Sequence, residues 1–497
     1  MKINFILLAL SLTVCCSCTN FLDESNPSNF TQENYFKSAE HARSIVNAIY
    51  ADFRYAASGD YGGNPYFMTD FMTGLAGTRV GQNQHINKIR MCINDSDNEY
   101  SKSWWNYPYR AIANANLAIT YIPDIEMDAT EKSKCLGEAY FLRAYNYFNM
   151  VRLFGSIPLI LIPVNASSPE LYPEQASIES IYAQIVSDLE EAEKSALPWT
   201  DTSGRVTMAA IKSVLAQVYM TMAGYPLQKG VEYYELAAEK AKEVIDSGTC
   251  SLFASYDDLH NEATENQKEH LLMIQYQSSV VENGLQYLYL PYNLDVSYYS
   301  TETGSIYALD EFIATYEEGD KRVKEGEFYY TKFTSNADRS KEINFGLHHI
   351  FKFFDMDAHL NTAKSSLNYP LLRYADILLL YAEAANEIEG QPSDKAYECI
   401  NKIRKRAELK PLFGLSQDQF RKAVWRERYH ELSFENKIWF DMVRTRKVLN
   451  LSTGDFDDYV GHKFTYGPVL GEKELLFPIP TSEMNNNKHL IQNTGYY

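Results

Sequence analysis

Apolar side chains recur at helical spacing in several long segments of this chain, and small alanines lie on the same stripe. Within and just after segment 368–387, the apolar positions fall at i, i+3, i+4, i+7, i+8 and i+11: Ile377, Leu380, Tyr381, Ala384, Ala385 and Ile388. Gly390 and Pro392 then end the predicted helix. Segment 396–409 repeats the stripe, so the two segments predict a helical hairpin.

Two more hairpins are predicted earlier in the chain. Segment 131–153 carries a similar stripe and is followed by Gly155, while Thr207 is a good N-cap for the next long helix. Consecutive hairpins with alanine at the helix contacts are typical of tetratricopeptide repeats, which we place at 129–196, 206–247 and 369–409. We therefore predict a mostly α-helical fold, with a helical-hairpin scaffold and long irregular loops.

The segment 425–444 is predicted to be another amphipathic helix, with charged residues of both signs. Arg428, Glu431 and Glu435 are neighbours on one side of it, and Asp441 and Arg444 follow. Such clusters occur in catalytic sites and also in structural ion-pair networks. We interpret this one as an ion-pair lattice that ties packed helices together. The closing segment, 477–497, has no helical period.

The N-terminus has the pattern of a secretory signal. Residues 3–14 form an apolar run, which is shorter than the roughly 20 residues that a membrane span needs. The run leads into Val14-Cys15-Cys16-Ser17-Cys18, which resembles a lipobox. We predict a lipoprotein signal peptide at 1–17 and lipidation at Cys18, with Cys16 as the alternative.

Composition limits the partners of the chain. The formal charge is −19, and removal of Lys2 with the signal peptide makes it about −20, which disfavours nucleic acid. An acidic surface suits a body held by a lipid rather than one lying on anionic headgroups. No Gly/Ser-rich, Pro-rich or charged linker divides the sequence, so residues 18–497 are predicted to be a single domain.

Taken together, the sequence blocks resemble the SusD/RagB family of outer-membrane nutrient-binding lipoproteins. Besides the C-terminal segments, the landmarks are WNYPYRAIANAN (105–116), FLRAYNYFNMVRLFGSIPLI (141–160), GRVTMAAIKSVLAQVYM (204–220) and FIATYEEGDKR (312–322). The resemblance implies a SusD-like fold, with an N-terminal part at about 19–220 and a C-terminal part at about 270–497. It also implies a lipid-anchored protein of the outer membrane, exposed on the cell surface, that is not an enzyme and needs no cofactor.

One position departs from the family pattern. Where the family commonly has Gly after Phe-Glu, this chain has Asn436, followed by Lys437 and Ile438. Asn tolerates the left-handed backbone conformation better than most residues, so we expect the turn to be retained.

Three functional hypotheses compete. The resemblance favours a lipoprotein that binds oligo- or polysaccharides and delivers them to a SusC-like TonB-dependent transporter. The alternative is a RagB-like protein that supplies the same type of transporter with peptides. A hydrolase is disfavoured, because the chain has no GxSxG, no HExxH and no Ser/His/Asp set.

Two loop regions, 55–104 and 275–307, are rich in aromatic and amide side chains. Sugar rings stack their C–H faces on aromatic rings, and their hydroxyls need polar partners, so this composition suits a glycan platform. In the family, ligand contacts commonly come from these stretches. The predicted ligand-contacting residues are Tyr61, Tyr66, Arg79, Asn83, Trp104, Tyr289, Tyr292, Tyr298 and Tyr299.

The remaining cysteines and the histidines give no metal signature. Cys92, Cys135, Cys250 and Cys399 are far apart and are predicted to be small buried hydrophobic residues, with one disulfide left open. His85, His348 and His349 lack a carboxylate or thiol at metal-binding spacing, so we interpret them as surface or hydrogen-bonded histidines.

Overall fold

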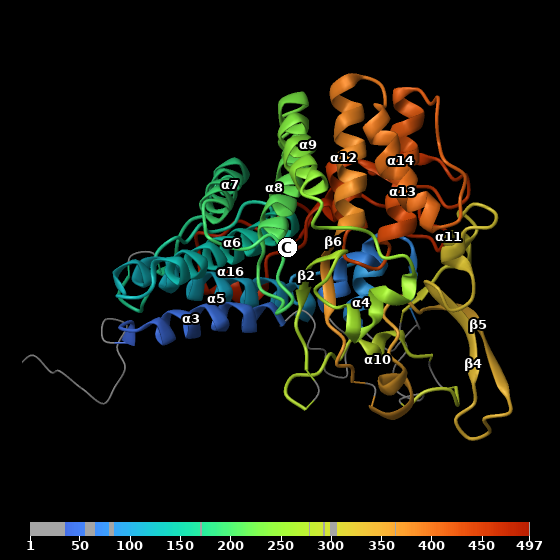
Figure 1. Cartoon of the computed structure of the whole chain (residues 1–497), viewed down its shortest axis with the longest axis horizontal. Coiled ribbons are helices and arrows are strands. Elements are labelled where there is room, and N and C mark those ends of the chain that lie inside the picture. Colours follow the sequence, from blue (N-terminus) through green and yellow to red (C-terminus); the bar gives the residue numbers. More distant parts are fainter. Residues whose placement is uncertain are drawn as a thin grey trace, which may run out of the picture.

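A computed structural model describes residues 35–54, 65–78, 84–168, 171–277, 279–291, 294–298, 306–362 and 364–496. Helices dominate the fold, and successive long helices pack against one another (Figure 1). The long helices are α3 (Ala39–Phe53), α5 (Glu99–Tyr121), α6 (Ala129–Phe154), α7 (Ile178–Glu193), α8 (Met208–Ala223), α9 (Val231–Asp246), α12 (Tyr374–Glu389), α13 (Asp394–Arg406) and α14 (Gln417–Leu432).

Shorter helices connect and cap these elements. The α-helices among them are α4 (Gln84–Arg90), α10 (Gln286–Tyr289), α11 (Asp310–Ile313), α15 (Ile438–Thr445) and α16 (Thr481–Asn486). The single-turn and 3-10 elements are η3 (Pro65–Met72), η4 (Ile122–Asp124), η6 (Tyr256–His260), η7 (Glu262–Thr264), η8 (Lys321–Val323) and η10 (Glu472–Leu475), and η9 (Ala358–Thr362) is a π-helix.

The three predicted hairpins are confirmed, because α6 packs on α7, α8 on α9 and α12 on α13. The predicted helix ends are confirmed as well. The Thr207 hydroxyl accepts a hydrogen bond from the backbone N–H of Ala210 at 3.2 Å, which caps α8. Gly390 follows α12 in the left-handed conformation, with φ 68°, and Gly155 follows α6.

The prediction of one helix over 425–444 was wrong, because the chain turns between α14 and α15. Phe434 and Asn436 both have positive φ, 62° and 57°, which a continuous helix does not allow. The prediction that Asn436 retains a left-handed turn is confirmed. Its backbone N–H donates to Asp70 Oδ2 at 3.3 Å, so the turn is held against η3, 366 positions earlier in the sequence.

Strands are few and short. An antiparallel sheet has the order β1 (Ala76–Gly77), β3 (Tyr307–Ala308), β5 (Glu342–Ile350) and β4 (Tyr329–Thr334), and its β4–β5 hairpin projects from the lower right of the molecule (Figure 1). Two further antiparallel pairs are β2 (His270–Ile274) with β6 (Tyr369–Arg373), and β7 (Lys447–Leu449) with β8 (Phe456–Asp458).

A network of buried ion pairs joins the helices of the C-terminal part to β6. Glu431 of α14 accepts hydrogen bonds from Arg406 at 2.8 Å and from Arg373 at 3.1 Å, and Arg373 also binds Glu435 at 2.6 Å. Further buried pairs join Arg322 to Asp320 and Glu427, Arg428 to Asp441, and Arg444 to Glu383. The interpretation of these charges as an ion-pair lattice is confirmed.

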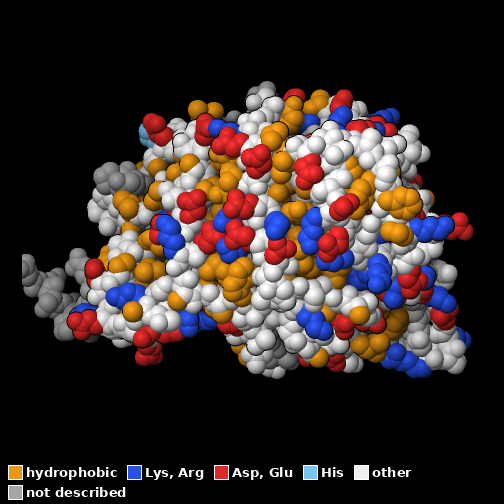
Figure 2. Space-filling model, turned by 45° about the horizontal axis from the view of Figure 1, so that its top comes forward, with side chains coloured by type: hydrophobic (Ala, Val, Ile, Leu, Met, Phe, Trp, Pro, Cys, Tyr) orange, Lys and Arg blue, Asp and Glu red, His pale blue; other side chains and the backbone are white. Residues whose placement is uncertain are grey.

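The surface shown in Figure 2 mixes charges of both signs. Asp and Glu side chains alternate with Lys and Arg side chains there, with apolar side chains between them. Cys135, Cys250 and Cys399 are buried and Cys92 is half-buried, all four with free thiols. Among the helices that the structure describes, none is both long and apolar enough to cross a membrane.

Candidate functional site

The two predicted loop regions meet in the sheet. Strand β1 comes from the first region and β3 from the second, and they pair with Ala76 opposite Ala308 and Gly77 opposite Tyr307. The N–H of Leu309 also donates to the carbonyl of Leu75 at 3.0 Å. Backbone pairing therefore brings together two segments that are far apart in the sequence.

A tyrosine ring lies on this junction. A β-carbon added to Gly77 would come within 2.1 Å of Cε2 of Tyr307, so the ring lies directly over the glycine. The Tyr307 side chain is half-buried, and its ring centroid is 6.3 Å from that of His349. Glycine is required here for close approach of the ring, and one side of the ring is used for packing.

The second loop region is also fastened to the β4–β5 hairpin. Asp295 accepts hydrogen bonds from the Ser335 hydroxyl at 2.5 Å and from the N–H of Ala337 at 3.0 Å. These hydrogen bonds lower the pKa of Asp295 below its ordinary value. The backbone N–H of Tyr298 donates to the carbonyl of His359 at 2.8 Å, while the Tyr298 side chain remains 55% exposed.

The described candidates differ in accessibility. Tyr298 is exposed, as a ligand contact requires. Trp104 does not fit the prediction, because it belongs to α5 and is buried in the core. Tyr289 does not fit it either, because it is buried with its ring stacked on Phe353 at a centroid distance of 5.4 Å. The remaining candidates, Tyr61, Arg79, Asn83, Tyr292, Tyr299 and Cys18, lie outside the described residues, as does the side chain of Tyr66.

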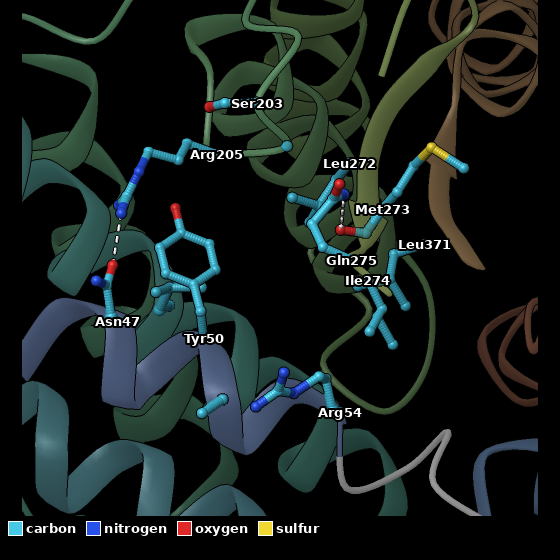
Figure 3. Close-up of a pocket in the computed structure, with 13 residues that line it drawn as sticks. Asn47, Tyr50, Arg54, Ser203, Arg205, Leu272, Met273, Ile274, Gln275 and Leu371 are labelled. Atoms are coloured by element: carbon cyan, nitrogen blue, oxygen red, sulfur yellow. Dashed lines mark hydrogen bonds between the residues drawn. The ribbon is translucent and has the colours of Figure 1, made fainter. Parts of the chain in front are cut away.

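A pocket of about 360 Å³ opens where the two loop regions leave the helical scaffold (Figure 3). Figure 3 shows Tyr50 of α3 and Arg54, the residue after that helix, on one side, and Met273 of β2 and Gln275, the residue after that strand, on the other. Arg54 directly precedes the first loop region, and Gln275 begins the second. We call this the loop-root pocket.

Polar side chains of fixed orientation line the loop-root pocket. Arg205 donates to Asn47 Oδ1 and to Glu138 Oε2, each at 2.5 Å, and the Tyr50 hydroxyl accepts from the N–H of Val206 at 2.9 Å. Burial raises the pKa of Tyr50 well above its ordinary value, so its hydroxyl stays protonated. Such an arrangement can bind hydroxyl-rich ligands through hydrogen bonds, while the charge of Arg205 is balanced by Glu138.

Gly204 shapes the same pocket. It has φ +81°, and a β-carbon there would overlap the Gln275 amide at 2.1 Å. Sequence reasoning missed these residues because they come from a helix, a strand and a tight turn rather than from the aromatic loops. The one sequence pattern that could have indicated this pocket is Gly204-Arg205, which comes shortly before the predicted N-cap Thr207.

The histidines show no metal centre. Among the residues that the structure describes, no group of three His, Cys, Asp or Glu side chains could hold a metal ion. His348 Nδ1 lies 2.9 Å from Asp310 Oδ1, an ordinary histidine–carboxylate contact. The interpretation of His348 as a hydrogen-bonded histidine is thus confirmed.

Comparison with known proteins identifies the family. A solved SusD superfamily protein from Parabacteroides distasonis is 35% identical, with a TM-score of 0.89, and the match covers 94% of this chain and 100% of that one. The chain belongs to the SusD family. Residues 297–496 match the SusD family itself, and residues 20–220 match a family described as "starch-binding associating with outer membrane".

Two further proteins show the range of the similarity. A SusD-like protein of Formosa agariphila is 29% identical over 100% of this chain and 99% of its own length. The surface glycan-binding protein A of Bacteroides thetaiotaomicron, solved in complex with laminarihexaose, is 20% identical with a TM-score of 0.74. That match covers 92% of this chain and 100% of the other, and at this identity it shows the shared fold.

Proposed function

We propose that this SusD-family protein is a non-catalytic lipoprotein that binds glycans at the cell surface and delivers them to a SusC-like TonB-dependent transporter. The observation that carries the proposal is the β1–β3 pairing, which places the two aromatic and amide-rich loop regions side by side. Tyr307 lies at that junction, and the exposed Tyr298 belongs to the same loop region.

The chemistry of this surface suits a sugar ligand. Aromatic rings offer a face on which the C–H side of a pyranose stacks, and each such contact contributes about 1 kcal/mol beyond area burial. Affinity then comes from several subsites and from closure against the transporter. The starch-binding description of the matching N-terminal family supports a glycan as the ligand.

Membrane attachment rests on the N-terminal motif. Cys18 follows Ser17 at the end of the predicted signal peptide, and the matching N-terminal family is described as associating with the outer membrane. A Cys18→Ala protein is expected to lose palmitate labelling in cells. Continued labelling of that variant, with loss only in Cys16→Ala, would move the anchor to Cys16.

The function is tested by a binding screen of the chain lacking residues 1–18. Calorimetry and affinity gels would use a set of polysaccharides, their oligosaccharides and a protein digest. Saturable binding to one glycan class is the expected result. Binding only to peptides would assign the protein to the RagB-like alternative. If no ligand binds, the proposal that the isolated protein binds glycans would be wrong.

Delivery needs its own measurement. The full-length lipoprotein, expressed with the SusC-like transporter of its own genome, is expected to co-purify with that transporter in detergent. A transporter that purifies without this chain would contradict the partnership, whatever the glycan screen shows.

A further inference from the structure

A second cavity, of about 420 Å³, is distinct from the loop-root pocket. Its walls come from the end of α6, the start of α7, the connection after α8, helix α15 and the C-terminal segment. None of its described lining residues belongs to 55–104 or 275–307. Its volume falls within the range of pockets that hold small organic ligands.

Arg446 gives this cavity its chemical character. Its Nη1 atom is buried and has no hydrogen-bond partner among the described residues. The guanidinium carbon lies 4.8 Å from the centroid of the Tyr225 ring, and burial lowers the pKa of Arg446 from its ordinary value. A buried donor without an acceptor is costly, so an acceptor supplied by a ligand would be favourable.

The other charges of the lining add to a positive excess. Lys473 donates to the carbonyl of Asn94 at 3.1 Å, its ammonium lies 4.6 Å from the centroid of the Tyr496 ring, and it forms no ion pair among the described residues. Arg152 also lines the cavity, with its guanidinium between the rings of Phe148 and Phe440, at 3.7 and 3.8 Å from their centroids.

Acidic groups balance only part of this charge. Arg444 is neutralised by Glu383, with two hydrogen bonds of 2.7 Å. Glu472 is the acidic residue of the described lining; it is exposed, and its negative charge offsets part of the lowering of the Arg446 pKa by burial. The remaining excess of positive charge in the lining favours anionic ligands.

The rest of the lining is apolar and aromatic. Tyr182, Tyr225, Phe440 and Leu476 belong to it, together with Val151 and Leu475. An inorganic anion would leave these surfaces in contact with water, whereas an aromatic or alkyl group would cover them.

We propose that this cavity binds a small organic carboxylate, with its carboxylate on Arg446 and Lys473 and its apolar body against Tyr182, Tyr225 and Phe440. Arg446 supplies a charge-assisted hydrogen bond from Nη1, and Lys473 supplies a second positive charge. The lining residues lie outside the two loop regions, so the proposal does not depend on the identity of the glycan.

The probe for this site is 4-phenylbutyrate, and 4-phenylbutanamide is its uncharged counterpart of nearly equal shape. Binding of both is measured by calorimetry on the chain lacking residues 1–18. We expect the carboxylate to bind and the amide to bind at least tenfold more weakly. Because a hydrogen bond to a charged group contributes strongly, Arg446→Gln should weaken carboxylate binding roughly 10- to 100-fold.

Three further proteins complete the test. Arg446→Lys keeps the charge and should retain more affinity than Arg446→Gln. Lys473→Gln should also weaken binding, and it gives an independent test if Arg446→Gln does not fold. Lys405→Gln removes the same charge at an exposed position outside the lining and should bind as the unsubstituted protein does.

Failure would be plain in each comparison. Equal affinity for the carboxylate and the amide, absence of carboxylate binding, or unchanged affinity in both Arg446→Gln and Lys473→Gln would overturn the proposal. A crystal structure with 4-phenylbutyrate elsewhere than in this cavity would do the same.

Discussion

The ring of Tyr307 covers the α-carbon of Gly77, and these two residues are paired across β1 and β3. Gly77→Ala would therefore force the ring to move, at a cost of about 1–3 kcal/mol in the free energy of unfolding. Tyr307→Ala removes the obstacle, so the double variant should be less destabilised than the sum of the two single variants. Urea unfolding of the three proteins measures this coupling.

A matched control for this cycle is Gly471→Ala. Gly471 has φ −117°, and an added β-carbon there would meet its nearest neighbour, Glu474 Oε2, at 3.2 Å. It should cost less than Gly77→Ala. Strict additivity in the Gly77 and Tyr307 cycle would show that the ring does not restrict the glycine.

Removing Glu431 should destabilise the protein strongly. Glu431 is fully buried and shared by Arg406, Arg373 and Arg322. Glu431→Gln leaves these cations with less compensation, so we expect a loss of about 3–5 kcal/mol in the free energy of unfolding. The exposed Glu389→Gln serves as the control and should change stability little; equal effects of the two would contradict a stabilising network.

The same carboxylate should make stability sensitive to acid. Burial alone would raise the pKa of Glu431, but the nearby Arg406 and Arg373 outweigh it and hold the pKa at about 2. The contribution of ionised Glu431 is therefore present above the unfolded-state pKa of about 4.3 and is lost as pH falls toward 2. Between pH 5 and 2, Glu431→Gln should lose less stability than the unsubstituted protein; parallel curves would refute the assignment.

Asp70 should give a pH dependence of the opposite sign. Its carboxyl is buried, and desolvation raises its pKa to about 8, against the hydrogen bond from Asn436. The neutral form stabilises the folded state below the unfolded-state pKa of about 3.9, and this contribution is lost as pH rises through 8. The free energy of unfolding should fall between pH 4 and 8, by up to about 1.4 kcal/mol per pH unit.

Asp70→Asn isolates this effect, because the amide cannot ionise. It should be more stable than the unsubstituted protein at pH 8 and close to it at pH 4. The exposed Asp97→Asn controls for the loss of one carboxylate. A variant that is destabilised equally at both pH values would show that Asp70 acts as an ionised group in the folded protein.

The exposed tyrosine of the second loop region tests the glycan surface. Tyr298→Ala should weaken binding of the glycan found in the screen about fivefold, since one stacked ring contributes about 1 kcal/mol. Its melting temperature should change little, because the side chain is 55% exposed. Tyr172→Ala removes a ring that is 53% exposed outside both loop regions, and a similar loss there would remove Tyr298 from the site.

The helical scaffold follows from local signals in the sequence. Helix ends and left-handed turns depend on one residue's own backbone or on its nearest neighbours, so they can be inferred without knowledge of the fold. Examples are the helix end at Gly390, the N-cap Thr207 and the left-handed Asn436. The charged lattice was also predictable, because the segment 425–444 brings charges of both signs close together, although Glu435 lies in the turn after α14 and not on the helix. The partners, such as Arg373, come from distant segments and could not be assigned.

The site was harder to predict because its elements are very short. Strands β1 and β3 have two residues each, which is too few for an alternating pattern. Trp104 was predicted as a ligand contact in preference to Trp105, because the family resemblance gives Trp105 a packing position, yet both belong to α5 and are buried in the core. Tyr307 and Arg446 acquire their surroundings only through tertiary contacts.

The hydrogen bond from Asn436 to Asp70 links the two family segments of the chain, one before residue 220 and one after residue 297. Recombination between two related genes, with its crossover between these segments, would produce a hybrid protein. Its η3 would come from one parent and its 433–437 turn from the other. In such a hybrid, the buried carboxyl of Asp70 would face a turn whose backbone N–H is not placed to donate a hydrogen bond to it. The two segments are therefore expected to be inherited together, and chimaeras should exchange η3 and the 433–437 turn as one unit.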